Sequence, residues 1–96
     1  MIEQTVGWTF LSNHAHVLVC LSRDPELRLR EIADAVGITE RAASSIIADL
    51  EGAGYLTRVK TGRRNTYRLH LRKPLRHPVE KDFRVGDLIA AVTIEP

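Results

Sequence analysis

Several features are scarce in this 96-residue sequence, and each shortage excludes a class of protein. A single cysteine, Cys20, rules out an internal disulfide and with it a disulfide-stapled secreted scaffold. The longest apolar run, VLVCL at 17–21, is far too short to span a bilayer. The N-terminal stretch MIEQTVGWTFL lacks the basic region of a signal peptide. We therefore expect a cytoplasmic protein that does not span a membrane.

Residue groups that would support catalysis or metal binding are also missing. The sequence has no recognisable nucleophile and base, no glycine-rich phosphate loop and no inward-facing carboxylate pair. His14 and His16 are two positions apart, which places them on different faces of a helix, and zinc needs four closely spaced ligands. We therefore predict neither an enzyme nor a metal site or other cofactor. Cys20 is interpreted as a small core hydrophobe.

The composition is that of one soluble domain. Hydrophobic residues make up 44% and charged residues 27% of the chain, proportions typical of globular proteins. A chain of this length buries roughly two thirds of its unfolded surface, which is enough for one modest core. We therefore predict a single domain over residues 1–96, without room for a separate ligand-binding domain.

Charge is distributed unevenly along the chain. Residues 1–57 carry four basic and eight acidic side chains, and residues 77–96 carry two basic and four acidic ones. Residues 58–76 between them carry eight basic side chains and no acidic one. A local field of this size persists although the formal net charge is only +2. The basic segment suits a nucleic acid, a membrane surface or plain solvation, depending on the structure that carries it.

The first predicted helix starts at residue 12. Residues 12–24 (SNHAHVLVCLSRD) predict a helix that Ser12 or Asn13 caps and that Pro25 ends. Its apolar side chains cover more than one face, so we expect this helix to be buried nearly all round.

Two more helices are predicted with only two residues between them. Residues 27–37 predict a short extended entry at Leu27–Leu29 and then a helix. This helix ends at Gly37, which tolerates the left-handed conformation that ends many helices. Thr39 is suited to cap the next helix, at residues 40–54. Each helix has one apolar stripe at helical spacing: Leu29, Ile32, Ala33 and Val36 in the first, and Ala43, Ile46, Ile47 and Leu50 in the second.

The basic segment alternates with period two around a glycine-containing turn, TGRRN, which predicts a β-hairpin. One face is expected to pack on the core, and its residues are Thr57, Val59, Tyr67, Leu69 and Leu71. The opposite face is expected to be cationic and polar, and its residues are Arg58, Lys60, Thr66, Arg68 and His70. A proline-punctuated connection, residues 72–83, follows the hairpin.

The order helix, short turn, helix and hairpin is that of a winged helix-turn-helix. Residues 29–70 (LREIADAVGITERAASSIIADLEGAGYLTRVKTGRRNTYRLH) resemble the winged-helix regulators of the MarR and ArsR type, most clearly in DLEGAGYL at 49–56. Ala33 stands where a small side chain lets the second helix cross the first, and Gly37 stands in the turn. The resemblance implies an α+β fold with a three-helix core, a two-stranded β-hairpin wing and a C-terminal helix. It also implies sequence-specific binding of double-stranded DNA by a homodimer.

By this resemblance, residues 29–54 form the helix-turn-helix, and its second helix enters the major groove. The predicted DNA contacts on this helix are Thr39, Arg41, Ser44, Ser45 and Ala48. Arg41 is suited to a bidentate contact with guanine, and Ala48 to a thymine methyl group. The alternative is a solvated helix face, because three acidic residues leave the segment net acidic.

The wing, residues 55–71, is predicted to contact the DNA backbone. Its contact residues are Lys60, Arg63, Arg64, Asn65 and Arg68. Such side chains position a protein on DNA without reading sequence, and the tip could instead enter a narrow minor groove. The alternative, an edge strand protected from aggregation by charge, needs only one or two lysines. No apolar wedge accompanies the charge, so we predict no membrane contact.

A last helix is predicted at 84–92, and its apolar stripe has two interpretations. The stripe packs on its own domain, or it joins the residues before the first helix in a two-fold interface, the commonest assembly. We favour the dimer, with residues 79–93 as its C-terminal segment. The predicted interface residues are Trp8, Phe10, Val85, Leu88, Ile89 and Val92.

Together these observations predict a sequence-specific transcription regulator that binds double-stranded DNA. We expect a repressor that acts as a homodimer on a near-palindromic operator, associates with the nucleoid and needs no cofactor. Whether a small-molecule effector is sensed is left open by the sequence. Two alternatives stay open: a winged-helix protein-interaction module, which the charge of the wing disfavours, and a sequence-neutral chromosome-organising protein, which the acidic helix at 40–51 would favour.

Overall fold

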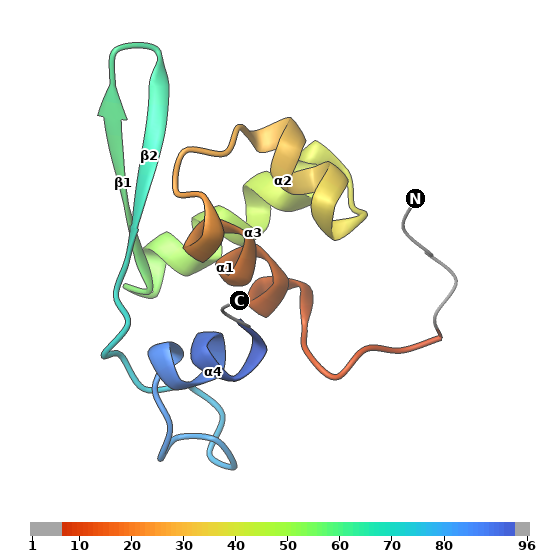
Figure 1. The fold of residues 1–96 in the computed structure, drawn as a ribbon, viewed down its shortest axis with the longest axis vertical. Coiled ribbons are helices and arrows are strands. Elements are labelled where there is room, and N and C mark those ends of the chain that lie inside the picture. The colour runs from red at the N-terminus through yellow and green to blue at the C-terminus, as the bar shows by residue number, and fades with distance from the viewer. Residues whose placement is uncertain (1–6, 94–96) are drawn as a thin grey trace.

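The computed structural model describes residues 7–93, which fold into four helices and one two-stranded antiparallel sheet. In chain order the elements are α1 (Asn13–Arg23), α2 (Leu29–Val36), α3 (Glu40–Gly52), β1 (Leu56–Thr61), β2 (Arg64–Leu69) and α4 (Val85–Val92). The first three helices pack together, the hairpin rises from them as a wing, and α4 lies at the opposite end (Figure 1). This is the predicted α+β winged-helix architecture. Residues 1–6 and 94–96 of the predicted domain lie outside the described range.

Helix boundaries fall where the local sequence chemistry predicts them. The Ser12 hydroxyl accepts a hydrogen bond from the N–H of Ala15 at 3.2 Å, and the Thr39 hydroxyl accepts one from Ala42 at 3.0 Å. Each bond satisfies an N–H group that the first turn of a helix leaves unpaired. α2 ends at Gly37, whose φ of 84° is left-handed and would cost a residue with a side chain about 1–2 kcal/mol. These predictions are confirmed.

One hydrophobic core lies between the first three helices and the base of the wing. Its buried residues are Val17, Leu18, Leu21, Ile32, Ala33, Ala43, Ile46, Ile47, Leu50, Tyr55, Leu56, Tyr67 and Val85. The predicted stripe of α3 is entirely buried, as expected. The prediction that α1 is buried nearly all round is wrong for the protomer, since Val19 and Cys20 are only partly buried. The neighbouring elements leave one side of α1 uncovered.

The register of the hairpin corrects the predicted faces. β1 and β2 pair antiparallel, with Leu56 opposite Leu69 and Arg58 opposite Tyr67. Directly opposed residues project from the same face of a sheet, so Arg58 shares the face of the buried Tyr67. Val59 lies on the other face and is 44% exposed. The assignment of Val59 to the core face and of Arg58 to the outer face is therefore wrong.

A two-residue turn causes this difference. Gly62 and Arg63 alone connect the strands, with a φ of 63° at Gly62 and a negative φ at Arg63, the pattern of a type II′ hairpin turn. A shift of one residue exchanges the two faces of a strand. Thr57 and Lys60 therefore also change places relative to the prediction, and Leu71 lies beyond β2, 48% exposed.

The base of the wing is fastened to its surroundings, whereas most of its outer half is exposed. The N–H of Tyr67 donates to the carbonyl of Pro25 at 2.9 Å, which joins β2 to the α1–α2 loop. The Tyr55 hydroxyl donates to the carbonyl of Pro74 at 2.6 Å. Along β1 only Leu56 is fully buried. The tip therefore projects beyond the core (Figure 1).

Residues 70–84 form an irregular connection from the wing to α4, as predicted. A hydrogen bond joins the two ends of this connection, because the N–H of Val85 donates to the carbonyl of Lys73 at 3.0 Å. The predicted last helix is present as α4, with Val85 fully buried and Ile89 packed against the core. Across residues 7–93, no helix combines the length and apolar character needed to cross a membrane.

Candidate nucleic-acid interface

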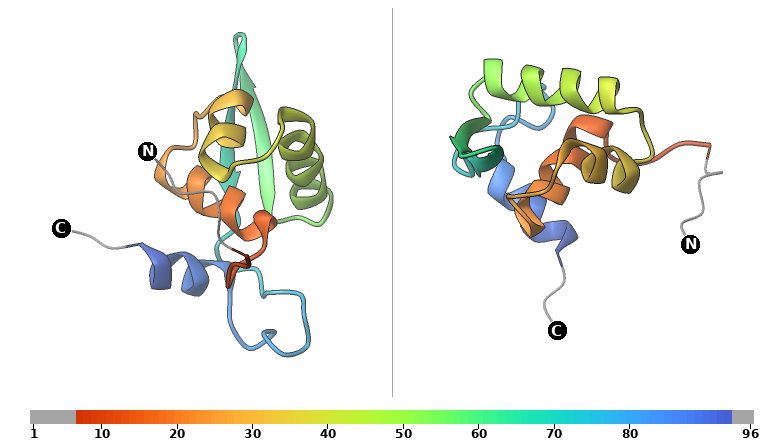
Figure 2. Two further views of the ribbon diagram at one scale, coloured as in Figure 1. Left: turned by 90° about the vertical axis from the view of Figure 1, so that its right-hand side faces the viewer. Right: turned by 90° about the horizontal axis from the view of Figure 1, so that it is seen from above.

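The outer face of α3 carries the predicted base contacts. Because the apolar stripe of α3 is buried, Arg41, Ser44, Ser45 and Ala48 are exposed on the side away from the core. Both views in Figure 2 place α3 at the edge of the helical cluster. The fifth predicted residue, Thr39, uses its hydroxyl oxygen to cap α3. The remaining four residues form an accessible, mostly polar surface.

The acidic residues of α3 have basic neighbours that sequence reasoning missed. Asp49 Oδ2 lies 2.9 Å from Nε2 of His14 on α1. Glu51 Oε1 accepts a hydrogen bond from the Arg58 guanidinium at 3.2 Å. Exposed pairs of this kind contribute only about 0–1 kcal/mol to stability, but Arg58, and His14 when protonated, offset negative charge beside the outer face of α3. The acidic composition of α3 is therefore a weaker objection to DNA binding than the sequence alone suggests.

Most of the predicted wing residues lie near the tip, Arg68 lies near the base, and they do not share one face. Lys60 and Asn65 oppose each other in the register, on the face of the buried Tyr67. Arg68 projects from the opposite face, and Arg63 lies in the turn. The basic side chains are exposed, whereas Asn65 is half-buried. The wing thus presents positive charge on both sides, toward α3 and away from it.

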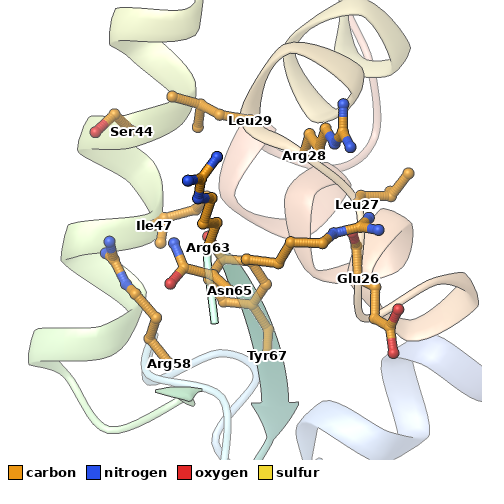
Figure 3. Close-up of a pocket in the computed structure, with 11 residues that line it drawn as sticks. Glu26, Leu27, Arg28, Leu29, Ser44, Ile47, Arg58, Arg63, Asn65 and Tyr67 are labelled. Carbon is orange, nitrogen blue, oxygen red and sulfur yellow. The ribbon is translucent and has the colours of Figure 1, made fainter. Parts of the chain in front are cut away.

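A cleft of about 320 Å³ separates α3 from the wing (Figure 3). Its lining includes four arginines, which are Arg28, Arg58, Arg63 and Arg64, and one acidic residue, Glu26. The Arg64 guanidinium donates to the backbone carbonyl of Glu26 at 3.1 Å, which ties the wing to the loop before α2. Sequence reasoning missed Arg28 and Arg58. The observed hairpin register would have placed Arg58 on the face of the cleft. No local pattern in the sequence indicates that Arg28 also lies there.

The predicted dimer residues are partly available at the surface. Trp8 and Phe10 are 71% and 92% exposed and make an edge-to-face pair with ring centroids 4.9 Å apart. On α4, Leu88, Ile89 and Val92 are half-buried. Val85 is fully buried in the core of the protomer, so it supports α4 from within and cannot touch a partner directly.

The described residues contain no cluster of three or more histidine, cysteine, aspartate or glutamate side chains that would hold a metal ion. Burial raises the pKa of the Cys20 thiol, and the neighbouring Arg23 guanidinium opposes this effect. A raised thiol pKa is the opposite of what a reactive cysteine needs.

A helix-turn-helix with an exposed second helix and a basic wing defines the class, a winged-helix protein. The sequence model of the MarR family matches residues 12–62, just over half of the chain. The chain belongs to the MarR family, whose members are transcription regulators.

Solved structures agree with this assignment. The PcaV transcriptional regulator from Streptomyces coelicolor, in complex with its natural ligand, aligns with a TM-score of 0.55 and 28% identity over 62% of this chain. MepR, a regulator of the Staphylococcus aureus multidrug efflux pump MepA, aligns with a TM-score of 0.57 and 19% identity over 84%. A MarR family protein of Mycobacterium tuberculosis, in complex with salicylic acid, aligns with a TM-score of 0.57 and 23% identity over 85%. The last two support the fold alone.

The chain is shorter than these proteins. It spans 45%, 56% and 57% of the three solved chains, which is about half of their length. No curated protein matches the sequence.

Proposed function

We propose that the protein is a sequence-specific, double-stranded DNA-binding transcription regulator that acts as a repressor. The observation that supports this most is the pairing of an exposed polar face on α3 with a basic wing beside it. A repressor of this kind occupies a promoter and blocks the polymerase. MarR family membership supports the class of function.

α3 would read sequence in the major groove. Recognition helices contact base edges through residues near their N-termini, and Arg41 is the second residue of α3. Its planar guanidinium suits the two acceptors of guanine. Ser44 and Ser45 would serve bases or phosphates, and Ala48 a thymine methyl group. Thr39 would contribute through its backbone, because its hydroxyl caps the helix.

The wing would position the protein on the DNA backbone. Lys60 and Arg63 are exposed near its tip, and Arg68 is exposed nearer its base. Their charge would attract phosphates regardless of base sequence. Arg64 is partly engaged with Glu26 and would contribute less.

A homodimer would place two copies of α3 on one face of the duplex. The proposed interface combines Trp8 and Phe10 with the half-buried edge of α4, formed by Leu88, Ile89 and Val92. Two reading helices in successive major grooves would lie about 34 Å apart, on a near-palindromic operator.

Fluorescence anisotropy with a labelled mixed-sequence duplex tests the wing. We expect binding that weakens steeply with salt, and a salt slope that falls by about 1 for each phosphate-contacting cation removed in Lys60→Ala and Arg68→Ala. Lys81→Ala, on the connection before α4, is the matched control and should bind like the wild type. Equal slopes for all four proteins would contradict the assignment of the wing.

A further inference from the structure

The arginine-lined cleft between α3 and the wing gathers more positive charge than its protein neighbours neutralise. Arg58 is paired with Glu51, and Arg64 donates to the carbonyl of Glu26. The backbone N–H of Arg28 donates to Oε1 of Glu31 at 2.8 Å. Within residues 7–93, however, the guanidinium groups of Arg28 and Arg63 make no hydrogen bond or ion pair. The cleft therefore holds two guanidinium groups whose donors are available to a ligand.

These two free arginines come from different parts of the fold. Arg28 immediately precedes α2 in the helix-turn-helix, whereas Arg63 lies in the turn of the wing. Figure 3 shows the Arg63 guanidinium next to Leu29 and near α3, and Arg28 farther along the lining, at the start of α2. The carboxylate of Glu26, the only acidic side chain of the lining, points away from Arg63. Both arginines thus line one cleft, although they come from separate parts of the chain.

The chemistry of the cleft matches an oxyanion. Guanidinium groups present their donors in a planar fork that fits phosphate oxygens. The buried residues Ile47 and Tyr67 line the cleft, and a poorly solvated wall strengthens the attraction between opposite charges. Four arginines around one cleft repel one another, and a bound anion would relieve that repulsion.

We propose that this cleft binds one phosphate group of the DNA backbone, held jointly by Arg28 and Arg63. The proposal rests on the proposed function as a DNA-binding protein. A phosphate shared by the two arginines fixes the wing relative to the helix-turn-helix when DNA is bound. The same phosphate then sets how deeply α3 enters the major groove. Arg28 is thereby a positioning residue for sequence reading, although it lies outside both α3 and the wing.

An NMR titration with inorganic pyrophosphate tests the cleft without DNA. We expect saturable shifts of the Nε–H resonances of Arg28 and Arg63 in the wild type. Arg28→Gln and Arg63→Gln should each abolish the shift of the remaining partner. Arg76→Gln, a basic residue on the connection before α4 and outside the cleft, should titrate like the wild type. Circular dichroism of each variant confirms that the fold is retained.

A double-mutant cycle on a labelled duplex tests the DNA phosphate. Hydrogen bonds to charged groups contribute about 1.5–3 kcal/mol, so Arg28→Gln and Arg63→Gln should each weaken binding by roughly 10-fold or more. Residues that share one ligand group are not additive, so the double variant should lose clearly less than the product of the two single losses. Arg28→Gln combined with Arg76→Gln should be additive.

The two arms separate the possible sources of the anion. Pyrophosphate shifts together with a non-additive cycle support the proposal. Pyrophosphate shifts with an additive cycle would mean that the cleft takes a free anion, which overturns the assignment to the DNA backbone. An absence of shifts and of coupling would overturn the site itself. A wild-type protein without DNA affinity would contradict the proposed function, and the NMR arm would still report whether the cleft accepts an oxyanion.

Discussion

Arg41 is the side chain on which sequence reading by α3 depends most. A bidentate arginine–guanine contact contributes about 1–3 kcal/mol of discrimination against the wrong base pair. We expect Arg41→Ala to weaken binding to the operator by that amount and to relax the preference at one base pair. Binding to mixed-sequence DNA should change much less.

Anisotropy with an operator and its single-base variants measures this effect, and Lys81→Ala is the control. An unchanged preference at every position would remove Arg41 from the reading surface.

Cys20 shows how burial governs a single titrating group. Burial raises the pKa of its thiol, and Arg23 offsets this in part. The thiol therefore stays protonated to higher pH than a free cysteine, and the thiolate that alkylating reagents need is scarcer. We expect iodoacetamide to label Cys20 more slowly in the native protein than in the urea-unfolded chain at neutral pH. The difference should narrow as the pH rises through the native pKa, and equal rates at neutral pH would contradict the account.

For the helices, substituting alanine for two glycines near helix ends should change the free energy of unfolding in opposite directions. Gly37 ends α2 with a φ of 84°, so Gly37→Ala should lower the free energy of unfolding by about 1–2 kcal/mol. Gly52 is helical, and a methyl group there would meet no atom within 4 Å, so Gly52→Ala should raise it by about 0.5 kcal/mol.

Urea unfolding followed by circular dichroism measures both changes. A loss of stability in both variants, or in neither, would contradict the role assigned to Gly37.

The helices were predictable because their signals are local. The caps at Ser12 and Thr39, the end of α2 at Gly37 and the stripe of α3 are each contained in a few neighbouring residues. The faces of the hairpin strands could not be predicted in this way, because they depend on the length of the turn. The two-residue connection at Gly62 and Arg63 reverses the β1 faces that a longer turn would give.

The site was predictable only in part, for the same reason. The outer face of α3 and the basic tip of the wing follow from periodicity and charge in consecutive residues. The His14–Asp49 contact and the position of Arg28 beside the wing depend on how separate elements pack. No spacing rule within one element indicates such contacts.

At the scale of the whole molecule, the dimer depends on apolar surface that the protomer leaves uncovered. Phe10 is 92% exposed, and burying a phenylalanine side chain contributes about 1.5–3 kcal/mol. In a two-fold interface both protomers bury this side chain, so its contribution to the free energy of association is made twice. Phe10→Asp should therefore raise the dimer dissociation constant by at least about 10-fold. Val59→Asp is the control, since Val59 is an exposed apolar residue on the wing, outside the proposed interface.

Sedimentation equilibrium at micromolar concentration measures both variants. A monomeric wild type would reject the dimer, and equal effects of the two substitutions would move the interface elsewhere.

We propose above all that this MarR family chain recognises a specific duplex site. Selection of sheared genomic DNA on the purified protein, at about physiological salt where non-specific binding weakens, followed by sequencing, tests it most directly. We expect enrichment of a short inverted repeat. Retention without enrichment, lost steeply as salt rises, would contradict sequence specificity and point to a chromosome-organising protein. No retention at all would contradict DNA binding and would indicate that the basic wing binds a protein partner.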